Sequence, residues 1–212
     1  MFIFQNYILI VIQPLIVKYQ CFNYSLDIKW QHNSEDINMT KPSPSKFITE
    51  GLNEAYEKLL MLSIKEAKLL KEKTGPALHD IIDTISQKTS EFGELTDVEL
   101  NKVSDYLKRD LKEAASYMAE NDKEFKDWLA LDTELIEEYL YEYFSKAADQ
   151  TTVELNKLKA NADAAEYHTG EITGPGVLVC DACGEQLHFT KAGHIPPCAK
   201  CHDTHFHRLL CK

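Results

Sequence analysis

Two Cys-x-x-Cys pairs near the C-terminus constrain the fold of this chain more than any other feature. The stretch CDACGEQLHFTKAGHIPPCAKCH contains four of the six cysteines in the 212 residues: Cys180, Cys183, Cys198 and Cys201. Fourteen residues (184–197) separate the two pairs, a spacing typical of zinc sites. Each pair makes a tight loop that directs two thiolates toward one point, and two facing loops complete a tetrahedron around Zn²⁺. We therefore expect these four cysteines to bind one zinc ion.

Disulfide bonds and iron binding are the alternatives to a zinc site for four clustered cysteines. A disulfide framework would spread cysteines along the chain, whereas this clustering indicates a metal site in a reducing compartment and so a cytoplasmic protein. Iron is the alternative metal because thiolates also bind it, but no motif for a partner redox cofactor accompanies the cluster. Four protein ligands leave no coordination position for water, so we expect a structural zinc ion and no catalytic residues.

Histidines surround the two pairs and offer further ligands. His202 follows the second pair at the position where Gly184 follows the first, and histidine tolerates the left-handed turn that glycine would ease. On a strand, residues two apart point the same way, so a weak surface metal site at His205 and His207 is one interpretation, and solvent-facing histidines are the other. Four histidines could replace a ligand or bind a second metal ion: His188, His194, His205 and His207.

Short β-strands are predicted around the cysteines. Residues 177–179 (Val-Leu-Val) lead directly into Cys180, and residues 186–190 should form their hairpin partner. Residues 205–207 can add a third strand. So small a module has little apolar core, and metal binding supplies much of its folding free energy. We expect residues 169–212 to form a small β zinc ribbon.

The middle of the chain, residues 39–168, has the apolar periodicity of amphipathic helices. Apolar stripes cover residues 47–67 and 78–92, and a third helix should start at Thr96, because Thr96 and Glu99 match a capping box. Long helices with short connections predict an antiparallel helical bundle or an extended helical hairpin. The predicted fold is therefore mainly α, in two domains: a helical domain at 39–168 followed by the ribbon.

The last helical region should run from about Lys123 to Ala165, with a break near Asp132, which can cap a new turn. A row of acidic residues follows this break: Glu134, Glu137, Glu138 and Glu142. These residues lack the Glu-x-x-His partner that a carboxylate metal site in a bundle requires. We expect them to form a solvated face.

Charge is unevenly distributed along the chain, whose net charge is −11. Residues 1–38 hold three acidic and two basic residues and residues 170–212 hold four of each, which leaves 27 acidic and 17 basic residues between them. Such an acidic middle repels nucleic-acid phosphates, and the neutral tail has no basic patch. We therefore expect a protein partner, with the chain as an interaction or regulatory adaptor. Nucleic-acid binding through the ribbon is the alternative, and no enzyme is expected because the motifs place no nucleophile beside a base.

The first 38 residues do not match the rest of the pattern. The apolar stretch MFIFQNYILIVIQPLIV is interrupted by polar residues and proline, and it is shorter than the ~20 residues of a membrane-spanning helix. We expect residues 1–38 to be an extension outside the functional fold, and no membrane association. An uncleaved membrane anchor is the alternative reading.

Three segments together resemble a known bacterial family. GELTDVELNKVSDYLKRDL, the later YHTGEITGPGVLVCDACGEQLHF and the second pair CAKC are similar to the zinc-ribbon-containing proteins of the YbeL-like family. The resemblance covers residues 39–208 and implies an N-terminal helical region, a C-terminal zinc ribbon and the four cysteines as metal ligands. It implies no activity. This chain departs from the family at His202, at the extra Cys211 and in residues 1–38.

Overall fold

The computed structural model describes residues 44–70, 78–88, 91–119, 123–158 and 165–210. Residues 42–209 belong to one compact unit. The extension predicted at residues 1–38 lies outside the described residues, as does Cys211. Side chains are described from Glu50 onward in the first helix and up to Val153 in the last, so Phe47 is not among them.

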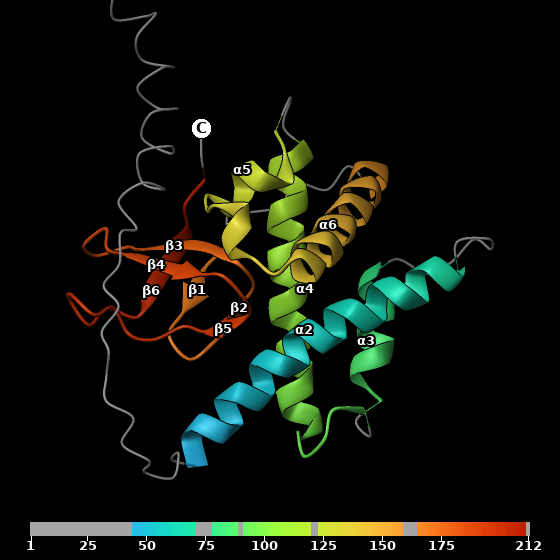
Figure 1. Ribbon diagram of the computed structural model, residues 1–212, viewed down its shortest axis with the longest axis horizontal. Helices are drawn as coiled ribbons and strands as arrows, with labels where there is room; N and C mark the ends of the chain where they lie inside the picture. The colour runs from blue at the N-terminus through green and yellow to red at the C-terminus, as the bar shows by residue number, and fades with distance from the viewer. Residues whose placement is uncertain (1–43, 71–77, 89–90, 120–122, 159–164, 211–212) are drawn as a thin grey trace, which may run out of the picture. The chain divides into compact units, whose positions relative to one another are not determined.

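Helices make up most of the described chain (Figure 1). Their bounds are α2 Pro44–Leu70, α3 Leu78–Ser86, α4 Asp97–Ala119, α5 Phe125–Leu129, the 3₁₀-helix η2 Thr133–Leu135 and α6 Glu138–Leu158. The predicted helical stripes are buried, among them Tyr56, Leu59, Ile82, Leu107, Leu111 and Phe144. The four glutamates after Asp132 are exposed, as predicted.

Local capping sets the starts of two elements. The Thr96 backbone N–H donates to Glu99 Oε2 at 2.8 Å and the Glu99 N–H donates back to Thr96 Oγ1 at 3.3 Å, which completes the predicted capping box. The Asp132 carboxylate accepts a hydrogen bond from the Glu134 N–H at 3.1 Å and begins η2. The predicted break in the last helical region is therefore confirmed.

Helix α4 packs against α2, α3 and α6 around a shared apolar core. Figure 1 shows α2 crossing α4 obliquely rather than running alongside it. The observed class is therefore helices with a small β part, and the antiparallel bundle is not confirmed.

In residues 165–210, six short strands follow the helices: β1 Tyr167–His168, β2 Ile172–Thr173, β3 Gly176–Cys180, β4 Gln186–Phe189, β5 Gly193–His194 and β6 His205–Arg208. The larger sheet has the order β1-β6-β3-β4 with all neighbours antiparallel, and β2 pairs with β5. The three predicted strands are confirmed as β3, β4 and β6. The two-residue strands β1, β2 and β5 were not predicted.

The helices and the ribbon share buried contacts within the unit. Ile172 and Ala192 from the ribbon belong to the same apolar cluster as the helix cores, while Leu178 and Phe206 belong to a separate cluster near the cysteines. The domain division at residue 168 stays a prediction. None of the helices in the described ranges has both the length and the apolar character needed to cross a bilayer.

Candidate metal centre

The four predicted cysteines come together at one end of the ribbon. The sulfur atoms of Cys180 and Cys201 lie 3.5 Å apart, and those of Cys183 and Cys198 lie 3.6 Å apart. All four sulfurs lie within 4.8 Å of one another. Zn–S bonds of about 2.3 Å at tetrahedral angles separate the sulfurs by about 3.8 Å. The cluster therefore has the size that a tetrahedral zinc ion requires.

The two cysteine loops have the same backbone hydrogen bonds. In the first loop, the Gly184 N–H donates to the Cys180 carbonyl at 2.9 Å and the Cys180 N–H donates to the Glu185 carbonyl at 2.8 Å. In the second loop, the N–H of residue 202 donates to the Cys198 carbonyl at 2.9 Å, and the Cys198 N–H donates to the carbonyl of residue 203 at 2.9 Å. Each loop thus places its two sulfurs in the same way.

Both loops need a residue in the left-handed region. Gly184 has φ +74° and His202, at the matching position, has φ +61°. This confirms the prediction that the histidine adopts the turn that glycine makes in the first loop. A side chain in this region costs free energy that glycine does not, so the second loop is the more strained of the two.

The two thiols of the second loop differ in how readily they lose a proton. Backbone N–H groups, first that of Cys201 and then that of Lys200, lower the pKa of Cys198 to about 7. The Asp203 N–H also lowers the pKa of Cys201, but the neighbouring sulfurs of the cluster raise it to about 12. Four thiolates so close together repel one another, so the donor set fits a bound metal ion, whose charge deprotonates coordinating thiols.

The other end of the ribbon is joined to the helices by a buried arginine. The Arg208 side chain has no exposed surface. Its Nε donates to Glu113 Oε2 at 3.0 Å, its Nη1 to the Pro175 carbonyl at 3.0 Å and its Nη2 to Thr173 Oγ1 at 2.8 Å. The guanidinium also lies 4.1 Å from the centre of the Trp128 ring. Arg208 therefore links β6 to α4 and α5.

Two tyrosines extend this polar contact. Asp110 accepts hydrogen bonds from the Tyr56 hydroxyl at 2.8 Å and from the Gly174 N–H at 2.7 Å, while the Tyr167 hydroxyl donates to Glu113 at 2.7 Å. Burial raises the pKa of both tyrosines well above the ordinary value, so both stay protonated. We name the group formed by Tyr56, Asp110, Glu113, Tyr167 and Arg208 the buried polar cluster. The sequence analysis did not identify this cluster.

The flanking histidines lie outside the sulfur cluster. Within the described part of the chain, the group of gathered ligand atoms consists of the four cysteine sulfurs. His188, His205 and His207 are exposed on the ribbon, and His194 is half-buried. The alternative in which a histidine replaces a cysteine ligand is therefore not supported.

Comparison with known proteins agrees with this geometry. The model of a family described as "Zinc-ribbon containing domain" matches residues 65–209, more than half of the chain. Similar proteins are the "Uncharacterized protein YbeL" of Escherichia coli K12 and that of E. coli O157:H7. Each is 28% identical over 154 residues, which cover 72% of this chain and 93% of the relative. No solved structure matches significantly. This chain belongs to the zinc-ribbon containing domain family.

Proposed function

We propose that this protein is a non-enzymatic adaptor that holds one structural zinc ion with Cys180, Cys183, Cys198 and Cys201 and docks a partner protein. The zinc assignment is supported by the sulfur spacing and by the donor set, since four thiolates close the coordination shell. When bound, the ion supplies folding free energy to a ribbon whose own apolar cluster is small.

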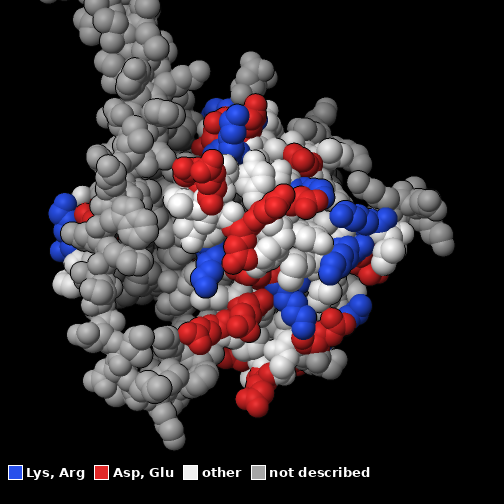
Figure 2. Space-filling view, in the orientation of Figure 1, with Lys and Arg blue, Asp and Glu red and all other residues white. Residues whose placement is uncertain are grey.

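The observation that carries the adaptor role is the burial of the ribbon's arginine. Nucleic-acid affinity comes chiefly from exposed lysine and arginine side chains that neutralise phosphates. Arg208 is buried against Glu113, and Lys200 lies 3.8 Å from Glu185. Only Lys191 and Lys200 are exposed cations in the described part of the ribbon. In Figure 2 acidic side chains spread over the face in view, and the basic ones lie in separate groups.

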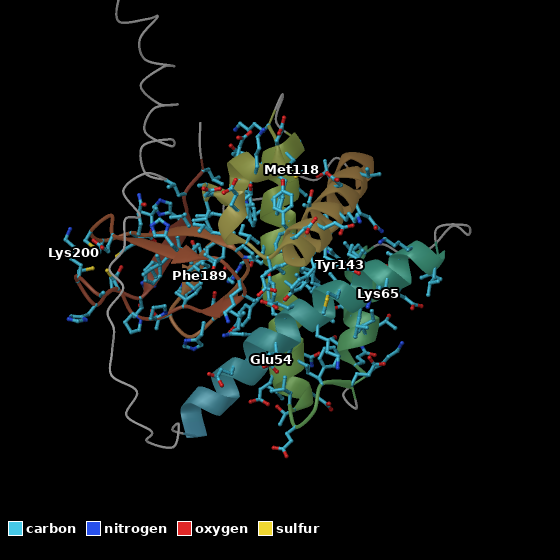
Figure 3. The ribbon with its side chains drawn as sticks, in the orientation of Figure 1. Glu54, Lys65, Met118, Tyr143, Phe189 and Lys200 are labelled. Atoms are coloured by element: carbon cyan, nitrogen blue, oxygen red, sulfur yellow. The ribbon has the colours of Figure 1, made fainter. Side chains whose placement is uncertain are left out.

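The end of the ribbon that carries the cysteines is the surface we assign to the partner. Figure 3 shows Lys200 at the end of the ribbon away from the helices, beside sulfur atoms drawn in yellow. Residues 199–202 are exposed there, although the loop backbone is fixed by its hydrogen bonds. A rigid exposed loop loses little conformational entropy on binding. A cytoplasmic location is the compartment in which these thiols would stay reduced.

Metal analysis tests the zinc assignment. The purified protein should contain one zinc ion per chain, and Cys198→Ser should lose it, because three thiolates no longer close the shell. Inductively coupled plasma mass spectrometry measures the stoichiometry. Stoichiometric iron with visible absorbance, or full zinc retention in Cys198→Ser, contradicts the assignment.

Two binding measurements test the adaptor role. In affinity purification, a partner protein should be retained by the wild type and by Lys65→Glu, an exposed site on α2, but lost with Lys200→Glu. Fluorescence anisotropy at neutral pH and near-physiological salt should detect no sequence-specific DNA or RNA binding. Submicromolar binding that is lost in Lys191→Ala and Lys200→Ala would instead make the ribbon a nucleic-acid module.

A further inference from the structure

Three histidines on the neighbouring strands β1 and β6 share one face of the larger sheet. Strand β6 lies between β1 and β3, and the register places His168 directly opposite His205. Along β6, His205 and His207 are exposed whereas Phe206 and Arg208 are buried. Because residues opposite each other in a sheet point to the same face and side chains alternate along a strand, all three imidazoles lie on the exposed side.

Two of these rings already lie at the separation found in a zinc site. The ring centres of His168 and His205 are 4.9 Å apart, with an angle of 74° between the ring planes. Zn–N bonds of about 2.0–2.1 Å at tetrahedral angles place two imidazole centres about 5 Å apart. His207 follows two residues after His205, one step along the same strand, so it can supply a third nitrogen.

The Nδ1 atom of each histidine faces an oxygen atom that can accept a hydrogen bond. His207 Nδ1 lies 2.5 Å from Asp181 Oδ1, and His168 Nδ1 lies 3.4 Å from Glu171 Oε1. His205 Nδ1 lies 3.2 Å from Thr204 Oγ1. Metal-binding histidines nearly always use one ring nitrogen for such a hydrogen bond and the other for the metal. The arrangement therefore leaves the three Nε2 atoms as ligands.

The surroundings favour a cation. A hollow of about 410 Å³ borders His168 and His205, and three carboxylates line it: Glu166, Asp181 and Asp203. The histidine side chains are 41% exposed at His168, 59% at His205 and 55% at His207. The three nitrogens are not yet gathered as the cysteine sulfurs are. Rings exposed to this degree can turn about their side-chain torsions to meet at one ion.

From this arrangement we infer that His168, His205 and His207 form a second metal site, on that face of the larger sheet, for a divalent transition metal ion such as Zn²⁺. Imidazole nitrogens select zinc, copper and nickel over magnesium and calcium, which prefer oxygen ligands. The site is separate from the four cysteines, and its affinity is lower because binding must order three exposed rings. Three protein ligands leave a fourth position for water or a carboxylate.

The test is a zinc titration of the full chain, prepared without a histidine tag and already loaded with one zinc ion. With a weak competing chelator present, the wild type should bind a second equivalent of Zn²⁺. His168→Ala and His205→Ala should each lose the second equivalent and keep the first, which serves as the check on folding. Asp181→Ala should weaken the second site about 10–100-fold, because it removes the acceptor for the His207 Nδ1 proton.

His188→Ala provides the matched control, since His188 is an exposed histidine on β4 of the same sheet. It should keep both equivalents. Long-range ¹H–¹⁵N spectra of the imidazoles should show the Nε2 signals of the three histidines shifting together as the second equivalent binds. Saturation of the wild type at one zinc ion, or a second equivalent that survives in His205→Ala, overturns the inference. Equal loss in His188→Ala overturns it as well.

Discussion

Replacing Arg208 with methionine should destabilise the whole unit rather than the ribbon alone. Methionine keeps much of the side-chain volume but removes the charge and all four hydrogen bonds that the guanidinium donates. Glu113, whose side chain is only 9% exposed, then lacks its cation, although the Tyr167 hydroxyl still donates to it. The substitution therefore leaves a buried carboxylate without a counter-charge.

The size of the effect follows from this burial. Removing one partner of a buried ion pair costs about 3–5 kcal/mol. A protein of this length loses about 2–4 °C of its melting midpoint per kcal/mol, so Arg208→Met should lower the midpoint by about 6–20 °C. The exposed pair of Lys146 with Glu142 provides a control, and Lys146→Met should cost less than about 1 kcal/mol.

A double variant separates the charge from packing. Glu113→Gln combined with Arg208→Met removes the unpaired carboxylate, so the pair should show a coupling free energy of about 0.5–3 kcal/mol in a double-mutant cycle. Urea unfolding followed by circular dichroism measures each free energy of unfolding. A cost below about 1 kcal/mol for Arg208→Met, or strict additivity with Glu113→Gln, would refute the assigned role of this ion pair.

The pH dependence of the Arg208→Met deficit provides a second check. Burial raises the pKa of Glu113, while Arg208 and the Tyr167 hydroxyl oppose the rise. Loss of Arg208 raises the pKa further. The pKa of Glu113 is therefore higher in the folded variant than in its unfolded chain. At a pH between these two pKa values, the folded state holds a proton that the unfolded state lacks, so the free energy of unfolding falls as the pH rises. The free energy of unfolding that Arg208→Met loses relative to the wild type should be smaller at about pH 5.5 than at about pH 8, with the zinc content verified at both. A deficit that grows on acidification contradicts this.

Three further predictions concern the metal and the caps. Chelation of zinc should lower the thermal midpoint of the helical circular dichroism signal but leave the helices folded at room temperature. The helices have their own core, but they lose the contacts of Arg208 when the ribbon unfolds. An unchanged midpoint would show that the ribbon does not stabilise the helices. In chelator competition, Gly184→Ala should weaken zinc binding and His202→Gly should strengthen it, each by about 1 kcal/mol, because both residues have a left-handed backbone conformation that favours glycine. Effects of the opposite sign would contradict this. Thr96→Ala should lower the free energy of unfolding by about 1 kcal/mol and Thr96→Ser should restore most of it, and equal losses in both would exclude capping as the cause.

The elements predicted correctly are those with a local signal. Apolar spacing located the helices, and the Thr96–Glu99 pair located the start of α4. The cysteine spacing located the metal centre because each Cys-x-x-Cys loop is built within a few residues. His202 could be placed in a left-handed turn because it matches Gly184 in the other loop.

The buried polar cluster could not be predicted in the same way. Its partners Glu113 and Arg208 are 95 residues apart, and charged side chains are ordinarily exposed. On α4 alone, Asp110 and Glu113 look like any polar helix face. Only the ribbon packed against them reveals that this face is covered. Strands of two residues, such as β1, are too short to show a periodicity.

Strand β6 has a consequence for biosynthesis. It follows Cys201 and ends at Arg208, so the last described strand to leave the ribosome both follows the final metal ligand and carries the cation for α4. Domains generally fold as units during synthesis, but α4 emerges with Asp110 and Glu113 and must wait about a hundred residues for their partner. A transcript truncated before codon 205 would yield helices with uncovered carboxylates and a sheet that lacks β6, one of its two central strands. Such a product would be a target for proteases, so a stable protein requires synthesis to continue through Arg208.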